Sequence, residues 1–147
     1  MFNKVDVPFP REIICYPGSI NTLPEKVSGK GKRIFVMVGS DRTKKAIGFD
    51  KIISGLEELN HKIVVYDKIT CEPSIQDIDN GAEVCRSEGC EVLVAIGGGS
   101  ILDSAKSISI LMNNPGSIRD YQMEKRTITT PGIKLIAVPT TAGTGSE

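Results

Sequence analysis

The sequence predicts an α/β protein built on a parallel β-sheet with helices on both faces. Short apolar runs alternate with segments whose apolar residues recur every three to four positions, as expected for strands that alternate with amphipathic helices. The runs at residues 33–38 and 91–96 are almost continuously apolar, which is typical of parallel strands buried on both faces. A glycine follows each of these two runs, and turns at strand ends are where such sheets bind ligands.

The predicted elements follow in chain order. Five strands are expected from the apolar runs, at residues 12–16, 33–38, 62–66, 91–96 and 134–138. The first of them, which precedes Pro17-Gly18, is expected to be an extra edge strand followed by a turn. Three helices are expected from the helical spacing of apolar residues, at 43–59, 75–87 and 101–112.

Local residues explain where these helices begin and end. The Thr43 hydroxyl can cap the free amides at the start of the first helix. Gly89 suits the C-terminal turn of the second helix, and the Asn-Asn-Pro-Gly segment at 113–116 stops the third. The polar segment from Ser117 to Gly132 is expected to be a connection that leads to the last strand.

Composition and charge exclude several classes of partner. The 147 residues are the size of one domain, and 18 basic residues balance 18 acidic ones. A neutral chain favours neither nucleic acid nor an anionic membrane as partner. No apolar run approaches the roughly 20 residues of a membrane span, and the N-terminal segment lacks a signal-peptide core. We therefore expect a cytoplasmic protein.

The chain has four cysteines, Cys15, Cys71, Cys85 and Cys90, and one histidine, His61. These residues lack the close spacing of a zinc site. Four cysteines allow two disulfides, but we expect reduced thiols that pack as small apolar groups. His61 stands at a helix-to-strand turn, and we expect an exposed loop residue there rather than a catalytic one.

The strongest chemical signal is Gly97-Gly98-Gly99-Ser100, between a predicted buried strand and a predicted helix. Glycines let the backbone turn tightly and approach a ligand, and a helix start presents free amides and a positive dipole end to an anion. Ser100 can donate its hydroxyl to a phosphate or cap the helix. Asp103, in the first turn, either contacts the ligand or is a favourable acid at a helix start. The turn lacks both the Gly-x-Gly-x-x-Gly spacing and the Gly-Lys-Ser/Thr of a triphosphate loop.

A second turn, residues 140–146, also follows a predicted strand. Its hydroxyl groups can form hydrogen bonds with a ligand, and its two glycines leave the backbone free to approach one. A flexible tail can have the same composition. Two such turns at one edge of a sheet favour the binding of a diphosphate.

Asp41 follows the predicted strand at 33–38. Its carboxylate either binds ribose hydroxyls and repels a 2′-phosphate, or caps a turn.

Two long segments resemble the N-terminal, cofactor-binding domain of the iron-containing (metal-dependent) alcohol dehydrogenases, which have a dehydroquinate synthase-like fold. Residues 95–106 (AIGGGSILDSAK) resemble the family's GGGSxxDxAK segment, and residues 136–147 (IAVPTTAGTGSE) resemble its PTTAGTGSE segment. Residues 72–74 stand where the family often has Pro-Asn-Pro, and residues 39–41 stand where NAD-preferring members carry an acid. The resemblance covers essentially the whole chain and implies a Rossmann-like sheet.

The resemblance also implies a set of cofactor contacts. It places them at Asp41, Ser74, Gly97, Gly98, Gly99, Ser100, Asp103, Thr140, Thr141 and Thr144. The glycine turn and Asp103 would meet the pyrophosphate and the nicotinamide side, and the threonines would line the adenine and ribose-phosphate region. Asp41 would favour NAD, with NADP as the alternative cofactor. The implied reaction is reversible hydride transfer between a small alcohol, or its aldehyde, and the nicotinamide, in a homo-oligomeric enzyme.

The family holds its divalent metal, commonly iron or zinc, with one Asp and three His of a helical C-terminal domain, and this metal polarises the alcohol oxygen. This chain ends before such a domain and has one histidine, so we expect no catalytic or metal-binding residue in it. We therefore expect residues 1–147 to be the NAD(P)-binding domain of a longer enzyme, and this piece alone to be inactive.

Two other interpretations stay open at this point. Glycerol dehydrogenases and dehydroquinate synthases resemble the same family and share its glycine turn, although the PTTAGTGSE segment favours the alcohol dehydrogenases. A stand-alone, non-catalytic nucleotide-binding module would be complete at this length. A reading frame that continues into Asp and His ligands would argue against the stand-alone module.

Overall fold

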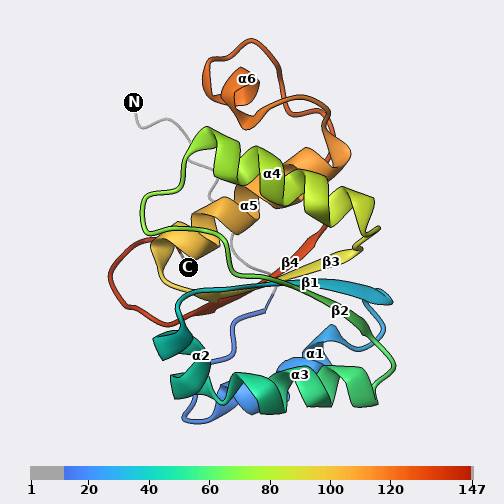
Figure 1. Ribbon diagram of the computed structural model, residues 1–147, viewed down its shortest axis with the longest axis vertical. Helices are drawn as coiled ribbons and strands as arrows, with labels where there is room; N and C mark the ends of the chain where they lie inside the picture. Colours follow the sequence, from blue (N-terminus) through green and yellow to red (C-terminus); the bar gives the residue numbers. More distant parts are fainter. Residues whose placement is uncertain (1–11, 147) are drawn as a thin grey trace, which may run out of the picture.

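A four-stranded parallel sheet forms the centre of the chain in this computed structural model, which describes residues 12–146 (Figure 1). The strands are β1 (Arg33–Val38), β2 (Lys62–Tyr66), β3 (Val92–Gly97) and β4 (Lys134–Pro139). They lie in the order β2-β1-β3-β4, and all three neighbouring pairs are parallel. Parallel neighbours need long crossover connections, which the intervening helices provide.

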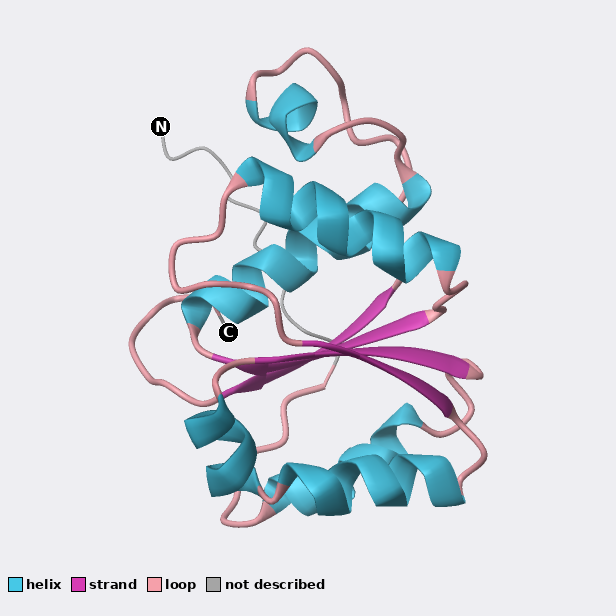
Figure 2. Cartoon of the chain, viewed as in Figure 1, coloured by secondary structure: helices cyan, strands magenta, loops and turns pink. Residues whose placement is uncertain are grey.

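Helices cover both faces of the sheet, as Figure 2 shows. One face carries α1 (Leu23–Val27), which follows the short 3₁₀ helix η1 (Ser19–Thr22), together with α2 (Asp41–Ile47) and α3 (Phe49–Glu58). The other face carries α4 (Ile75–Ser87) and α5 (Gly99–Asn113), with α6 (Ile118–Gln122) beyond them. The predicted α/β class, with a Rossmann-like parallel sheet and helices on both faces, is confirmed.

The two inner strands supply the centre of the core. Every residue of β3 is buried, and every residue of β1 after Arg33 is buried as well. Successive residues point to opposite faces of a sheet. Ile34 therefore packs with the helices of one face, while Phe35 packs with those of the other. This burial on both faces explains why the sequences of these two strands are almost continuously apolar.

The strand predictions hold except at the N-terminal end. β1 and β2 have the predicted bounds, β3 is shifted by one residue at both ends, and β4 is one residue longer than predicted. The edge strand predicted at residues 12–16 is wrong, because residues 12–15 form no regular structure and Ile13 is 73% exposed. The turn after it is present, with Gly18 at a φ of 81° and the Ser19 amide donating to the Tyr16 carbonyl over 3.0 Å.

The single helix predicted from Thr43 to Leu59 is two helices. Gly48 has a φ of 65°, in the left-handed region that glycine adopts without steric cost, and it ends α2 and begins α3. α2 begins at Asp41 rather than at Thr43, whose hydroxyl lies 3.4 Å from the Ser40 hydroxyl. The apolar spacing continues across Gly48, so periodicity alone did not reveal the break.

The connection at 117–132 contains α6, which the sequence did not predict. Ser117 caps this helix, because its hydroxyl accepts from the Arg119 amide over 3.2 Å. A second cap comes from α4, where the Asp79 carboxylate accepts from the Ile118 amide over 2.9 Å and from the Ser117 hydroxyl. Two of the free amides at the start of α6 are thus satisfied, one of them by a residue far away in sequence.

All four cysteines are free thiols. Cys85 and Cys90 are buried as expected, but Cys15 and Cys71 are exposed, so the prediction of packed thiols is wrong for these two. Cys90 donates its amide to the Cys85 carbonyl over 3.0 Å across the left-handed Gly89, a helix ending that brings the two side chains together. A hydrogen bond with the Cys90 thiol, together with burial, raises the pKa of the Cys85 thiol.

His61 occupies the predicted turn between α3 and β2, but it is half-buried rather than exposed. Its amide donates to the Leu56 carbonyl over 3.2 Å, and Asn60 has a φ of 61°. This conformation folds the chain back over the end of α3. The ring therefore packs inward, and its Nε2 atom is buried without a hydrogen-bond partner among residues 12–146.

Candidate functional site

The carboxyl ends of the four strands lie at one edge of the sheet, because the strands are parallel. The chain leaves β1 toward β2 over one face and leaves β3 toward β4 over the other (Figure 1). The connections thus diverge between β1 and β3, where the Gly39 amide donates to the Ile96 carbonyl over 3.2 Å. Open α/β sheets bind ligands at such a switch point.

The glycine turn joins β3 to α5 at this edge. Gly97 ends the strand, Gly98 is the N-cap residue and Gly99 begins the helix. A Cβ atom at Gly97 would lie 2.7 Å from Cγ1 and 2.8 Å from Cβ of Ile101, which is closer than such atoms pack. Glycine at this position lets the first turn of α5 sit directly against the end of β3.

The turn after β4 lies against the glycine turn. The Thr140 amide donates to the Gly97 carbonyl over 2.9 Å, so the two segments are joined at their base. A Cβ atom at Gly98 would lie 3.2 Å from the Thr141 hydroxyl oxygen, and one at Gly99 would lie 3.4 Å from Cβ of Thr144. The structure therefore brings the two predicted turns together.

Asp103 lies in α5 one turn after the glycines. Its Oδ2 atom accepts from the Ser146 hydroxyl over 2.9 Å, and its Oδ1 atom lies 3.3 Å from the Lys106 ammonium. Lys106 also donates to the Ser146 carbonyl over 2.6 Å. Lys106 and Ser146 were not among the predicted site residues, although both stand inside the two segments that carry the resemblance.

Ser100 and Ser74 connect this edge to the loop before α4. The Ser100 hydroxyl donates to the Cys71 carbonyl over 2.5 Å. Ser74 caps α4, because its hydroxyl accepts from the Asp77 amide over 3.2 Å while the Asp77 carboxylate accepts from the Ser74 amide over 2.8 Å. The Ser74 hydroxyl also donates to the Asp77 carboxylate over 2.7 Å, and this hydrogen bond, together with the one from the Ser74 amide, lowers the pKa of Asp77. A Ser-x-x-Asp pattern in the sequence is the local signal for such a cap.

Acidic residues follow β1 and β2 at the same edge. Asp41 begins α2, its side chain is 98% exposed, and its carboxylate lies 3.3 Å from the Lys44 ammonium. Lys44 also donates to Asp67, just after β2, over 2.6 Å. That hydrogen bond lowers the pKa of Asp67 and raises the pKa of Lys44. Two carboxylates share one ammonium here, so this end of the site is poorly suited to a further negative charge.

The residues at the switch point fit the pyrophosphate of a dinucleotide. The amides of Gly99 and Ser100 stand at helix positions that have no partner within the helix. The dipole of the 15-residue α5 favours an anion at the same point. A side chain at Gly98 or Gly99 would fill the narrow space between the two turns. The arrangement can thus hold an anionic group close to the backbone.

The described residues do not fit a metal site. Residues 12–146 contain no group of three or more His, Cys, Asp or Glu side chains that could hold a metal ion. Among the same residues, none of the helices is long and apolar enough to cross a bilayer.

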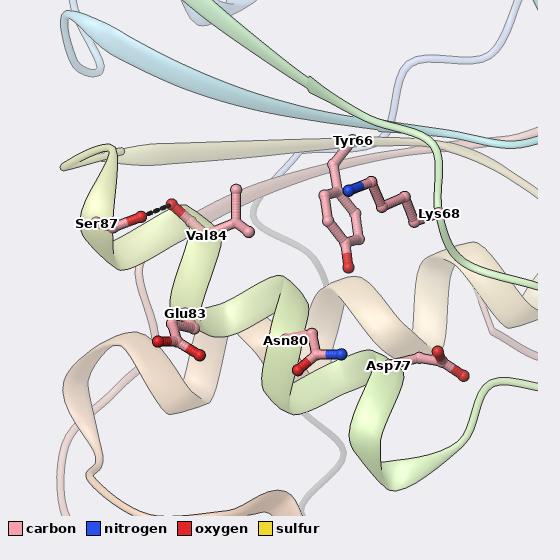
Figure 3. A pocket seen from close by; sticks show the side chains of 7 residues that line it. All are labelled: Tyr66, Lys68, Asp77, Asn80, Glu83, Val84 and Ser87. Carbon is pink, nitrogen blue, oxygen red and sulfur yellow. Dashed lines mark hydrogen bonds between the residues drawn. The ribbon is translucent and has the colours of Figure 1, made fainter.

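A separate surface pocket lies between β2 and α4, as Figure 3 shows. It has a volume of about 480 Å³ and is lined by Tyr66, Lys68, Asp77, Asn80, Glu83, Val84 and Ser87. None of these residues belongs to the two turns at the switch point. The pocket is therefore not the space that the predicted site residues enclose.

Comparison with known proteins places these features in a family. The sequence pattern of the iron-containing alcohol dehydrogenases matches residues 10–147. A probable alcohol dehydrogenase of Escherichia coli, EutG, is 35% identical over 143 residues, which are 94% of this chain and 35% of that protein.

Solved structures agree with the sequence comparison. An archaeal halo-thermophilic alcohol dehydrogenase from a Red Sea brine pool superposes with a TM-score of 0.79 at 31% identity, over 87% of this chain and 34% of its own. Sulfoacetaldehyde reductase from Bifidobacterium kashiwanohense, solved in complex with NAD⁺, has a TM-score of 0.75 at 27% identity, over 88% of this chain and 34% of its own.

The chain spans about a third of the length of these relatives. Within that span, the match covers the whole sheet, the glycine turn and the turn after β4. A match of this extent shows the family, and the chain belongs to the iron-containing alcohol dehydrogenases.

Proposed function

We propose that this chain is the NAD-binding domain of an enzyme that reversibly transfers a hydride between a small primary alcohol and the nicotinamide. The observation that carries the proposal is the meeting of two turns, residues 97–100 and 140–146, at the switch point of the sheet. Membership of the family supports an oxidoreductase that acts on alcohols. The NAD⁺ complex of the sulfoacetaldehyde reductase supports the choice of cofactor.

Five residues of the site would contact the cofactor directly in this proposal. The amides of Gly99 and Ser100 would bind the pyrophosphate at the start of α5. The Thr141 and Thr144 side chains lie over the glycines, and their hydroxyls would bind the ribose-phosphate region. Asp41 would accept hydrogen bonds from ribose hydroxyls. Together these groups would orient the nicotinamide toward the alcohol.

When bound, the nicotinamide would supply the hydride acceptor or donor, and a divalent metal would supply a Lewis acid for the alcohol oxygen, held by groups outside residues 12–146. The part of the reaction that this chain can perform is therefore to bind and orient the cofactor. The metal ligands and the wall of the alcohol pocket would come from outside residues 12–146.

Direct binding tests the proposal. Titration of the 147-residue chain with NADH, followed by the fluorescence of the nicotinamide, is expected to give saturable binding that NAD⁺ displaces. Adenosine diphosphate is expected to compete as well, because it carries the pyrophosphate that the glycine turn would hold. An absence of saturable binding by both fluorescence and calorimetry would contradict the proposal.

The 147-residue chain alone is expected to oxidise no alcohol. It would bind the hydride acceptor but would leave the alcohol without a Lewis acid, since residues 12–146 offer no metal site. The measurement is NADH production from small primary alcohols with Fe²⁺ or Zn²⁺ added. Metal-dependent alcohol oxidation by the purified chain would refute this prediction while leaving NAD binding intact.

Asp41→Asn and Asp41→Gly are expected to relax discrimination against NADP. Each variant removes an exposed carboxylate that would repel the 2′-phosphate and leaves the Lys44 ammonium beside it. The ratio of NADP(H) to NAD(H) affinity is expected to rise by up to about fivefold, because a solvent-exposed charge pair contributes little in water. Asp50→Asn on the neighbouring helix α3 is the matched control. An unchanged ratio in both Asp41 variants would make Asp41 a turn residue only.

A further inference from the structure

Ser146 is the one buried residue of an otherwise exposed loop. Residues 140–145 are all exposed, whereas Ser146 is only 6% exposed. Gly143 and Gly145 both have a positive φ, at 82° and 71°. Glycines lose much conformational freedom when they are ordered, so a loop of this composition needs anchors to keep one shape.

The loop has an anchor at each end. At its start, the Thr140 amide donates to the Gly97 carbonyl over 2.9 Å. At its end, the Ser146 hydroxyl donates to Asp103 over 2.9 Å, and the Ser146 carbonyl accepts from Lys106 over 2.6 Å. Thr141 and Thr144, which lie over Gly98 and Gly99, stand between these two anchors.

The second anchor uses both oxygens of Asp103. Oδ2 binds the Ser146 hydroxyl, and Oδ1 lies 3.3 Å from the Lys106 ammonium, one turn further along α5. Lys106 also contacts both residues, through the Asp103 carboxylate and the main-chain carbonyl of Ser146, so the three residues close a ring of contacts. The Lys106 charge also offsets the Asp103 carboxylate, which would otherwise oppose an anion at the start of the helix.

We infer that Asp103, Lys106 and Ser146 form a latch that holds the 140–146 loop on the first turns of α5 and thereby positions the Thr141 and Thr144 hydroxyls for the cofactor. The latch residues act through the loop, and Asp103 is a positioning residue rather than a direct contact of the nicotinamide or the pyrophosphate. This inference rests on the proposed binding of NAD at the two turns.

The first test measures the loop without any cofactor. Ser146→Ala in the 147-residue chain is expected to speed amide hydrogen exchange in peptides spanning residues 139–147 roughly fivefold, the effect of losing one hydrogen bond. Lys106→Met is expected to do the same, and Ser146→Thr and Lys106→Arg are expected to restore protection because they keep the donors. Ser107→Ala is the control, since its hydroxyl donates only to the Asp103 carbonyl of its own helix, over 3.0 Å.

The second test separates a positioning role from a direct contact. Ser146→Ala and Asp103→Ala are each expected to weaken NADH binding about tenfold, and the double variant is expected to bind no more weakly than Asp103→Ala alone. Residues that act as one unit show such non-additive losses. Losses that multiply in the double variant would show that Asp103 touches the cofactor itself, and would overturn the inference.

The two proposals fail in different ways. Unchanged exchange in Ser146→Ala, in a chain that still binds NADH, would overturn the latch and leave the proposed function standing. Faster exchange in the variants of a chain that binds no NADH would overturn the proposed function and the positioning role together. Thermal unfolding of every variant within a few degrees of the parent chain confirms that the comparison is made between folded proteins.

Discussion

Gly97→Ala is expected to abolish most NADH binding and to destabilise the fold. The new methyl group would lie 2.7 to 2.8 Å from the Ile101 side chain, and one of the two close atoms is Cβ, which cannot move without the helix backbone. α5 must therefore shift away from β3, and its first amides move from the place where the pyrophosphate would bind. Overpacking of this kind costs about 1–3 kcal/mol, which corresponds to a loss of affinity of about five- to 150-fold if it falls on the binding geometry.

The measurement is a pair of titrations, one with NADH and one with urea. Gly39→Ala is a matched steric control for the urea titration, because Gly39 also follows an inner strand but its Cβ would lie no closer than 3.4 Å to any neighbour. This control is expected to unfold within about 0.5 kcal/mol of the parent chain. Equal affinity and equal stability in Gly97→Ala would mean that the helix start does not need the close approach seen at Gly97.

Gly132→Ala is expected to be among the most destabilising single-atom additions to the chain. A Cβ atom at Gly132 would lie 2.7 Å from both the carbonyl carbon and the carbonyl oxygen of Ser109 in α5. These are backbone atoms, so no rotation of a side chain relieves the overlap. We expect a loss of about 3 kcal/mol, which lowers the melting temperature of a chain of this size by roughly 10 °C.

A second-site variant tests the origin of this loss. The Ser109 hydroxyl also lies against Gly132 and donates to the Ile133 carbonyl over 2.7 Å. Ser109→Ala removes the hydroxyl and leaves the backbone in place, so Ser109→Ala combined with Gly132→Ala is expected to remain destabilised. Recovery of the parent melting temperature in the double variant would show that the hydroxyl alone causes the overlap.

The strands were predictable because their signal is local and strong. β1 and β3 lie in the middle of the sheet, so both of their faces are buried and their sequences are apolar throughout. The outer strands are only partly buried, yet β2 was also predicted with its observed bounds. The false strand at residues 12–16 had the same apolar character but finds no partner strand among the described residues.

The helix errors have a different cause. The break at Gly48 depends on a left-handed φ, which glycine can adopt but does not have to adopt, so the apolar spacing across it indicated one helix. α6 depends on Asp79, which lies 39 residues before Ile118 and caps it only after α4 and the connection have packed together. No local pattern could reveal a cap supplied from that distance.

The candidate site was also predictable only in part. The two turns could be predicted because glycines after a buried strand are a local feature, and parallel strands must end at the same edge. The roles of single residues could not. Ser74 caps α4 with Asp77, and Asp103 binds Ser146, which is 43 residues away. The resemblance placed both residues in a set of cofactor contacts, but it did not indicate their partners within the chain.

The sequence by itself determined the alternation of strands and helices, the two central strands and the glycine turns at their ends. These follow from burial and backbone freedom, which act on neighbouring residues. Only the tertiary structure decided which distant groups meet. The parallel register of β3 and β4 sets Gly97 opposite Pro139, and this places the 140–146 loop on α5 within reach of Asp103 and Lys106. Such contacts depend on strand register and helix packing, which no single segment of the chain specifies.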